Sequence, residues 1–480
     1  MDTNKLFNRQ YILCESASFR LKWEFSEIGG LFLHRHPELE FETIDEESRK
    51  IILLGNIYDS TFPLKTNLEI LKCLAHERSF SSILQAQNKY GGHYVIFVET
   101  EKDLLIFNDA AAQFELYYNS SFSIFASQLS LIKEFQTLHL NRDQSFREFY
   151  TSSTFKKQGI LVGNTTPYQD IFHLRPNHFL QVSSKEHIRF FPTLKIQEVT
   201  TEDVAEKSAQ IIQGFIQAIT SRQKSVIGVT AGYDSRILFL SSLESKASYY
   251  VSQHAGMDEN HCDLSIPTQI TSFYRKELRI IKDRELADEQ SEEYLYSIDF
   301  PRKRTGRSGD FLGSVFINGN VSEVARNYYG YLPNLAGEDL SYLNHFGDLK
   351  LPAQEYDAWL KSFRSDLSSF GIHELDLFYW EERLGNWGAK GKSEWSALGD
   401  ILISPFNCRE LLSLLISCPR KDRDAHKSAL YDKIILNLDK DGLKFPINPS
   451  KKENTIRLMK KLGIYKIYRR IGLKYRLLKF

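Results

Sequence analysis

The chain has 480 residues, of which 42% are hydrophobic and 25% are charged, and these proportions are ordinary for a globular protein in water. This length accommodates two or three domains, each with a sizeable core. Lysine plus arginine and aspartate plus glutamate balance at 61 each, so no net field favours nucleic acid and we predict no nucleic-acid partner.

The cysteines and the N-terminal stretch predict a cytoplasmic protein. The cysteines have no CxxC spacing and are odd in number, which favours a reducing compartment and argues against a zinc site or a disulfide framework. No basic region followed by an apolar stretch opens the chain, and no run of about 18 apolar residues occurs, so we expect neither a signal peptide nor a membrane span. The five cysteines are Cys14, Cys73, Cys262, Cys408 and Cys418.

Short strand-like runs rich in β-branched and aromatic residues fill the first part of the chain, from Gln10 to Leu194. Two helices are predicted among them, over Leu64–Glu77 and Phe80–Asn88. The pattern indicates an α+β domain whose sheets pack face to face. The predicted strands include Arg20–Phe25, Lys50–Leu54, His93–Val98, Leu104–Phe107, Leu116–Tyr118 and Ser121–Phe125.

A domain boundary is predicted near residue 195. Thr200 is a candidate N-cap, and apolar residues then recur at helical spacing from Val204 to about Ser221, which indicates an amphipathic helix. Beyond it strands and helices alternate, as in a parallel α/β sheet. We therefore predict domains over residues 1–195 and 196–450, and a separate C-terminal segment over 451–480.

The stretch Lys224–Phe239 reads as a strand, a tight loop and a helix start. Val226–Val229 is apolar, Thr230-Ala231-Gly232 forms the turn, and Tyr233-Asp234-Ser235-Arg236 opens an apolar segment with helical spacing. Such a junction presents backbone N–H groups and a helix N-terminus to phosphate, although many strand-to-helix turns share the bare pattern. Asp234 would face phosphate favourably only through a divalent cation.

Further strands are predicted over Ser248–Gln253 and Ser314–Asn318, followed by a mostly helical part. His254, Asp258, Glu259 and Asp263 come soon after the first strand, where a solvated acidic loop is the plain alternative to a ligand site. An aromatic face around Trp380 is predicted to be core. The later helices are predicted over Ala353–Ser369, Leu375–Trp387, Cys408–Ile416 and His426–Leu438.

The residues TAGYDSR, from Thr230 to Arg236, resemble the Ser-Gly-Gly-x-Asp-Ser pyrophosphate loop of the asparagine synthetase-like, N-type ATP pyrophosphatases. Thr230 stands for the serine and Ala231 for the first glycine. Segments of the first 195 residues resemble the class II glutamine amidotransferase domain of that family. These segments are Leu54–Tyr58, Tyr90–Tyr94, Asn108-Asp109, Glu115–Tyr118, Phe125–Ser127 and Leu174–His178.

The resemblance implies an Ntn-hydrolase-like sheet sandwich, then an α/β parallel-sheet nucleotide-binding domain with a helical C-terminal part. It also implies that ATP binds to the loop and to Gly319 in a second signature. Asp234 and Glu323 would hold Mg²⁺, although Asn320 stands where an acid is usual. The residues implied for ATP are Thr230, Ala231, Gly232, Tyr233, Asp234, Ser235 and Gly319.

Basic residues of the helical part complete the implied site. Lys427 is our choice for a lysine that stabilises the leaving pyrophosphate, with Lys421 and Arg423 as rivals. Arg383 and Arg409 are candidates for binding a substrate carboxylate, although a paired arginine is the commoner outcome.

The first domain lacks the nucleophile that such a glutaminase needs. In the family, a cysteine exposed as residue 1 uses its own α-amine as base, whereas this chain has Asp2 after Met1. Cys14 lies in the apolar run YILC and is predicted to be buried. We therefore expect the fold without glutamine hydrolysis.

Together these features predict an ATP- and Mg²⁺-dependent ligase. A substrate carboxylate is adenylated, pyrophosphate leaves, and ammonia or another amine attacks the acyl-adenylate to form an amide-type bond, in a surface-polysaccharide or natural-product pathway. The alternative is a relative that has lost catalysis and serves as a binding or scaffold protein. The sequence leaves a homo-oligomer open.

The C-terminal segment, residues 451–480, is basic and amphipathic. It contains eleven lysines or arginines and one acid, Glu453, with apolar residues interleaved. Such stretches lie on anionic membrane surfaces, on acidic partners or on the protein's own body. A peripheral membrane contact, a protein contact and an intramolecular contact are all open on the sequence.

Overall fold

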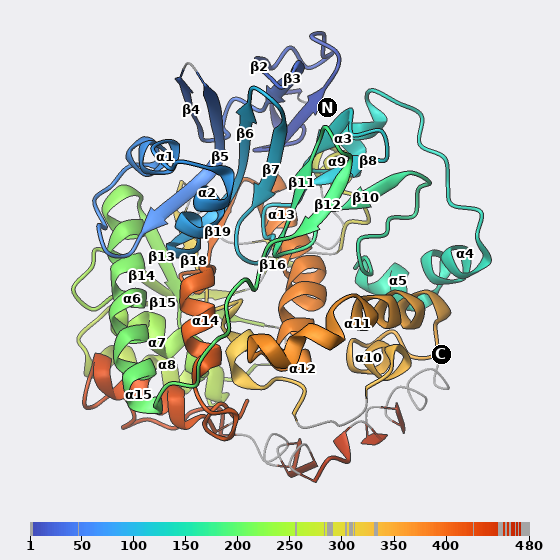
Figure 1. Cartoon of the computed structure of the whole chain (residues 1–480). Helices are drawn as coiled ribbons and strands as arrows, with labels where there is room; N and C mark the ends of the chain where they lie inside the picture. Colours follow the sequence, from blue (N-terminus) through green and yellow to red (C-terminus); the bar gives the residue numbers. More distant parts are fainter. Residues whose placement is uncertain are drawn as a thin grey trace.

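A computed structural model of the chain contains three sheets of five or six strands and surrounding helices (Figure 1). It describes residues 3–471 except 47, 255–256, 283, 286–290, 303–304, 307–310, 312, 331–334, 426, 450–454, 457, 460–461, 466 and 469. Two antiparallel sheets come from the first 189 residues, and a parallel sheet follows. The predicted succession of an α+β sandwich and an α/β sheet is confirmed.

The first antiparallel sheet has the strand order β10-β8-β9-β1-β3-β2, and every neighbouring pair is antiparallel. Its strands are short, and residues 20–23, which we expected in a strand, form a turn instead. Lys22 adopts a left-handed φ of 53°, which ends any extended run there. The strands are β1 (Tyr11–Cys14), β2 (Glu24–Ile28), β3 (Leu31–Arg35), β8 (Tyr117–Asn119), β9 (Ile124–Ala126) and β10 (Ile171–His173).

The second antiparallel sheet has the order β12-β11-β7-β6-β5-β4. Its two long central strands pair over eleven residues, from Arg49 opposite Thr100 to Asp59 opposite Tyr90. The strands are β4 (Phe41–Glu46), β5 (Arg49–Asp59), β6 (Tyr90–Thr100), β7 (Leu104–Asn108), β11 (His178–Gln181) and β12 (Glu186–Arg189).

The apolar run in β5 is continuous because both faces of this strand are covered. Ile52 and Leu54 point into the core between the two antiparallel sheets, with Leu13 of β1. Ile51 and Leu53 point to the opposite side, where helices α1 (Asn67–Ala75) and α2 (Phe80–Ala86) pack. The predicted face-to-face packing of the sheets follows from this alternation.

The cysteine at the end of β1 is buried, as predicted. Cys14 is 2% exposed, and burial raises the pKa of its thiol, which disfavours the nucleophilic thiolate.

The sequence did not indicate the short helices between the two sheets' strands, α3 (Leu129–Lys133), α4 (Gln144–Thr151) and α5 (Ser153–Gln158).

The parallel sheet has the order β15-β14-β13-β18-β19. Helix α6 (Thr201–Arg222), capped by Thr200 as predicted, leads into its central strand β13 (Ser225–Gly228). Helix α7 (Tyr233–Ser241) follows β13, and α8 (Cys262–Phe273) follows β14. The other strands are β14 (Ser248–Gln253), β15 (Leu278–Lys282), β18 (Val315–Ile317) and β19 (Ile401–Ile403), and a separate two-stranded ribbon joins β16 (Arg284–Glu285) to β17 (Thr305–Gly306).

The later part of the chain is largely helical, with bounds that differ from the predictions at their ends. The predicted helix Leu375–Trp387 is an α-helix only at its start and continues as a π-helix over Tyr379–Gly388, where Trp380 is buried as expected. The helix expected from His426 begins at Ala429, and His426 lies outside the described residues. The helices are α9 (Glu292–Ser297), α10 (Gly337–Leu343), α11 (Lys350–Phe370), α12 (Glu374–Phe378), α13 (Ala389–Ala397), α14 (Arg409–Ser417) and α15 (Ala429–Leu438).

A buried polar seam joins the antiparallel sheets to the helical part. The Arg409 guanidinium donates to Asn177 Oδ1 at 3.0 Å and to Gln87 Oε1 at 2.7 Å. Glu382 accepts from the Gly163 amide at 3.0 Å and from Arg175 at 3.1 Å. All of these partners lie before residue 195, so the predicted boundary separates two units that share buried hydrogen bonds.

The described part of the C-terminal segment packs on the body through one side. Ile456 and Met459 pack against the core, Tyr465 is buried, and Arg470 donates to Asp339 Oδ1 of α10 at 2.8 Å. Other apolar side chains of the segment are exposed, namely Leu458, Leu462, Ile464, Ile467, Tyr468 and Ile471.

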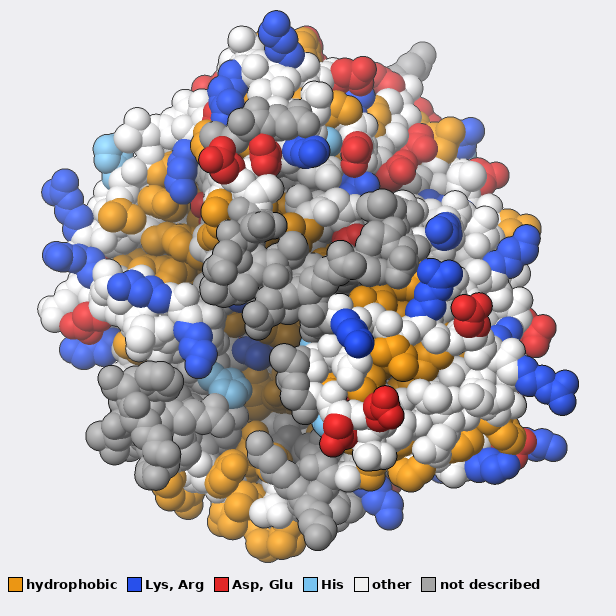
Figure 2. Space-filling model, turned by 180° about the vertical axis from the view of Figure 1, so that it is seen from behind, with side chains coloured by type: hydrophobic (Ala, Val, Ile, Leu, Met, Phe, Trp, Pro, Cys, Tyr) orange, Lys and Arg blue, Asp and Glu red, His pale blue; other side chains and the backbone are white. Residues whose placement is uncertain are grey.

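Charges of both signs are spread over the surface. Figure 2 shows basic side chains scattered across one face, with acidic ones among them and densest near the upper edge, as the balanced composition leads one to expect. None of the helices in the described ranges combines the length and the apolar character needed to cross a bilayer.

Candidate functional site

Three neighbouring strands of the parallel sheet end at one cavity. β14, β13 and β18 lie side by side, and residues of their carboxyl halves and of the segments that follow line a space of about 330 Å³. Ligands of open α/β sheets bind at this edge. The lining residues are Gly228, Val229, Thr230, Gly232, Asp234, Ser235, Tyr250, Val251, Ser252, His254, Met257, Asp263, Asn318, Gly319 and Asn320.

Five of the seven residues predicted to bind ATP line this cavity, namely Thr230, Gly232, Asp234, Ser235 and Gly319. Ala231 and Tyr233 do not. The Tyr233 side chain is buried beneath the loop and its hydroxyl donates to Asp432 Oδ1 at 3.1 Å. Tyr233 therefore anchors α7 to α15, and its phenol has no place in the cavity.

The loop amides already have partners within the protein. The Thr230 amide donates to Ser235 Oγ at 3.0 Å, and the Gly232 amide donates to Thr230 Oγ1 at 3.2 Å. The Ala231 amide donates to Asp263 Oδ1 at 3.1 Å. A phosphate at these amides must therefore displace a carboxylate as well as hydroxyl oxygens.

A long side chain of α7 fixes the loop from behind. The Arg236 guanidinium is buried and donates to the carbonyl oxygens of Phe445 at 2.5 Å and Pro446 at 2.8 Å. The Asn448 amide in turn donates to the Ala231 carbonyl at 3.1 Å. The segment after α15 thus holds the loop in one conformation.

Close packing brings the two sequence signatures together at Gly319. A Cβ built on Gly319 would lie 2.3 Å from Asp234 Cβ, so only glycine allows this approach. Ser322 Oγ also donates to Asp234 Oδ1. The two segments therefore lie against each other, and the binding of ATP between them stays a prediction.

An arginine stands between the two carboxylates that we predicted to hold Mg²⁺. Arg326 Nη2 donates to Asp234 Oδ2 at 2.9 Å and lies 3.8 Å from Glu323 Oε1. Both oxygens of Asp234 are therefore engaged by protein donors. As arranged, Asp234 and Glu323 do not fit a two-carboxylate Mg²⁺ site, which needs free oxygens about 2.1 Å from the ion.

Burial and the neighbouring charges shift the pKa values of Glu323 and Arg326. Burial, reinforced by the neighbouring Asp234 carboxylate, raises the pKa of Glu323, and Arg326 opposes the shift. Burial alone would lower the pKa of Arg326, but Asp234 and Glu323 outweigh it and raise that pKa. Arg326 is therefore a permanent positive charge beside two acids.

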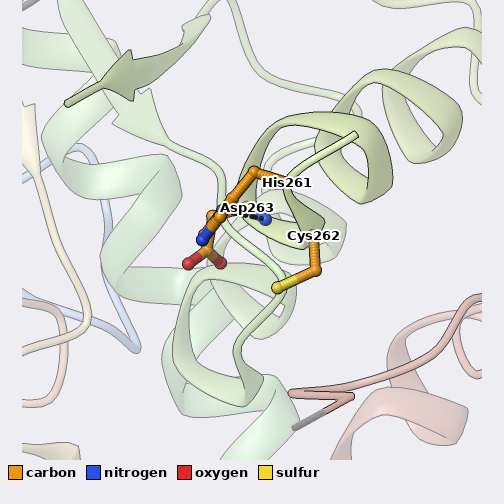
Figure 3. Close-up of side chains that lie close together, drawn as sticks. All are labelled: His261, Cys262 and Asp263. Atoms are coloured by element: carbon orange, nitrogen blue, oxygen red, sulfur yellow. Dashed lines mark hydrogen bonds between the residues drawn. The ribbon is translucent and has the colours of Figure 1, made fainter. Parts of the chain in front are cut away.

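Three side chains at the start of α8 bring potential metal-ligating atoms within 4.8 Å of one another, namely His261, Cys262 and Asp263 (Figure 3). The contacts of two of them are structural, because His261 caps α8 and Asp263 binds the Thr230–Ser235 loop. His261 Nδ1 accepts from the Asp263 amide at 3.2 Å, and Asp263 accepts from the loop. The positive end of the helix dipole at this point also disfavours a cation.

The remaining predicted residues lie away from the cavity lining. Lys427 is exposed and precedes α15, and its backbone amide donates to Asp424 Oδ1 at 3.0 Å. Its assignment to the leaving pyrophosphate stays a prediction. Arg409 is 1% exposed within the polar seam, which contradicts a role in binding a substrate carboxylate. Arg383 is half-buried over the Trp387 ring, 4.8 Å from its centroid.

The sequence did not identify two further residues of the site, Asp263 as partner of the loop and Arg326 as partner of Asp234. Both are charged residues soon after a strand of the parallel sheet, which was the available signal. The acids Asp258 and Glu259 share that signal and yet are exposed outside the cavity lining.

No family model and no curated protein matches the chain. Among solved structures it is similar to the "allosteric regulatory enzyme of purine biosynthesis", with 9% identity, 59% of this chain and 77% of that chain covered, and a TM-score of 0.26. It is also similar to glutamine phosphoribosylpyrophosphate amidotransferase from B. subtilis in complex with ADP and GMP, with 10% identity, coverages of 68% and 72%, and a TM-score of 0.24. Likenesses this distant indicate no reaction, and the resemblance to asparagine synthetases rests on the motifs alone.

Proposed function

We propose that the chain is an ATP-dependent ligase that adenylates a carboxylate and transfers the acyl group to an amine. The observation that supports this proposal is the convergence of two separate signatures, Thr230–Ser235 and Gly319, on one cavity at the carboxyl edge of the parallel sheet. The cavity volume of about 330 Å³ lies in the range of small-molecule sites.

The proposed chemistry proceeds in two steps. A carboxylate oxygen attacks the α-phosphorus of ATP, and the bond to the β-phosphate breaks to release pyrophosphate. The amine nitrogen then attacks the acyl carbon, AMP leaves with the bonding electrons, and the nitrogen loses a proton. The loop would hold the phosphates, and Lys427 would stabilise the charge on the leaving pyrophosphate.

The amine in this proposal is ammonia or a second substrate's amino group. The chain has Asp2 where a glutaminase of this type has its nucleophilic cysteine, and Cys14 is buried with a raised pKa. Glutamine should therefore be a poor nitrogen donor.

The test is to incubate the purified full chain with ATP, Mg²⁺ and a panel of carboxylates and amines, and to assay AMP and pyrophosphate. Equal amounts of both are expected, with little ADP or phosphate, and Asp234→Asn should abolish them. Replacing ammonia by glutamine should lower the yield. Failure to bind ATP and to form AMP across the panel contradicts the proposal.

A second function, ligand binding without turnover, is favoured by the occupied state of the loop. Asp263 accepts from Ala231, and Arg326 pairs with Asp234, as expected of a site that has lost catalysis. In the same assay, ATP binding without AMP formation would select this second function.

A further inference from the structure

One arginine, Arg326, lies directly behind a residue that lines the cavity. Arg326 is the last residue of a short 3-10 helix, Ser322–Arg326, and its side chain is only 12% exposed. Its guanidinium donates to Asp234 Oδ2 at 2.9 Å, and Asp234 lines the cavity while Arg326 does not. Arg326 therefore acts on the cavity through Asp234.

The guanidinium is held in place from several directions. Its Nη1 donates to the Ala425 carbonyl at 3.5 Å, and its Cζ lies 5.8 Å from the centre of the Tyr431 ring. The Tyr431 hydroxyl donates to the Ser322 carbonyl at 2.9 Å, which fixes this ring against the same short helix. Since Asp234 of α7 holds the guanidinium from one segment and Ala425 and Tyr431 hold it from another, Arg326 is built into the fold.

The charge balance at this point decides what the site needs. Asp234 and Glu323 without Arg326 would carry up to two negative charges at the edge of a cavity intended for an anion, and a divalent ion would be required to offset them. Arg326 supplies a fixed positive charge that cannot dissociate or lose its proton at ordinary pH. A metal ion between the same carboxylates would lie against this guanidinium, and the two cations would repel.

We propose that Arg326 is the resident cation of this cavity, standing in for the Mg²⁺ that the sequence predicts between Asp234 and Glu323. Phosphate-bearing ligands then bind at Thr230–Ser235 without a metal held by the protein. This inference rests on the proposed function for the identity of the ligand, but the position of the cation is argued from the contacts of Arg326 alone.

The carboxylates themselves suggest what would follow if Arg326 were removed. Glu323 Oε2 is buried and has no hydrogen-bond partner, and Asp234 Oδ2 would lose its donor. Two uncompensated carboxylates side by side are hard ligands of the kind that Mg²⁺ and Mn²⁺ prefer. Removing the guanidinium should thus turn a metal-independent site into a metal site.

The first experiment measures binding of inorganic pyrophosphate to the full chain by calorimetry, in EDTA and in excess Mg²⁺. The wild-type dissociation constants are expected to agree within about threefold. Arg326→Gln should weaken binding in EDTA about tenfold or more and recover with Mg²⁺, whereas Arg326→Lys, which keeps the charge, should retain binding in EDTA. Wild-type binding that is absent in EDTA and restored by Mg²⁺ would overturn the inference.

The second experiment needs no anion and separates this inference from the proposed function. Mn²⁺ binding to the free protein is followed by electron paramagnetic resonance. Arg326→Gln is expected to gain a site that disappears in Arg326→Gln/Asp234→Asn, while the wild type lacks it. A wild-type Mn²⁺ site lost in Asp234→Asn, or a folded Arg326→Gln protein that gains none, overturns the inference. Absence of pyrophosphate binding under every condition contradicts the proposed function and leaves the Mn²⁺ result to decide on Arg326.

Discussion

Gly319 and Asp234 touch so closely that the two signatures of the site share one packing contact. A Cβ on Gly319 would lie 2.3 Å from the Cβ of Asp234 and 3.3 Å from its backbone. Contacts below about 3.0 Å force atoms to shift, so the approach of β18 to α7 depends on this glycine.

Gly319→Ala should therefore destabilise the protein by about 2 kcal/mol and displace Asp234. Urea unfolding and ATP binding provide the measurements. Gly228→Ala is the matched control for stability alone, because its new Cβ would meet the Tyr250 ring at a tolerable 3.4 Å but the residue also lines the cavity. If Gly319→Ala and Gly228→Ala were equally stable, the contact between Gly319 and Asp234 would not limit the stability of the protein.

Asp263 accepts a hydrogen bond of 3.1 Å from the Ala231 amide, so it competes with any phosphate for that donor. Asp263→Asn keeps an acceptor but removes the negative charge, so pyrophosphate affinity should rise about tenfold, as measured by calorimetry. Asp258→Asn, a change at an exposed acid shortly before α8, should have little effect. Weaker binding in Asp263→Asn would mean that the carboxylate helps to hold the ligand.

The buried acid Glu382 should make stability depend on pH. Burial raises its pKa to about 7, with Arg175 opposing the shift. Because the folded pKa is raised, the protonated form stabilises the fold at low pH, and this contribution is lost as pH rises from about 4.5 through 7. Glu382→Gln mimics the protonated form.

The free energy of unfolding of the wild type should thus fall relative to that of Glu382→Gln by about 2 kcal/mol between pH 5 and pH 8. Urea unfolding at several pH values measures the difference. Glu410→Gln, at an exposed position, is the control and should run parallel to the wild type. If the wild type instead lost stability relative to Glu382→Gln as the pH fell, the pKa of Glu382 would not be raised by burial.

The two arginines that the sequence offered for a substrate carboxylate should behave differently. Arg409→Ala leaves the buried Asn177 oxygen without its donor and removes one of the two donors of Gln87 Oε1, so it should cost about 3 kcal/mol of stability. Arg383→Ala loses one hydrogen bond of 3.4 Å to Asn344 and should cost less than about 1 kcal/mol. A stable Arg409→Ala protein that fails only in ligand binding would restore the substrate role.

The exposed apolar side chains of the C-terminal segment predict attachment to an anionic membrane surface, since residues 451–480 carry eleven basic residues. The full chain should co-sediment with phosphatidylglycerol vesicles and not with phosphatidylcholine vesicles. Changing Leu458, Leu462, Ile467 and Ile471 together to Ser should abolish binding. Leu194→Ser, at another exposed apolar position, is the control, and equal sedimentation of both variants would contradict the prediction.

Local patterns predicted much of this molecule because they depend on neighbours in sequence. The strand, turn and helix from Lys224 to Phe239 follow from apolar spacing and small residues, and the observed β13 and α7 differ from it only at the ends. Burial on both faces of β5 likewise leaves a continuous apolar run in the sequence.

Side-chain pairing across the fold left no such trace. Asp234 meets Ser322 and Arg326 across 88 and 92 residues, and the choice of a guanidinium instead of a metal ion depends on geometry that spacing does not encode. Arg409 looked like a binding residue because sequence shows its charge but not its burial. The sequence therefore predicted the loop but not the arginine that pairs with its Asp234.

The polar seam at Arg409 and Glu382 makes the antiparallel sheets and the helical part depend on each other for buried hydrogen bonds. Cutting the chain near residue 195 would separate Arg409 from Asn177 and Gln87, and Glu382 from Gly163 and Arg175. The antiparallel sheets therefore supply partners that the helical part needs in order to bury these two charges.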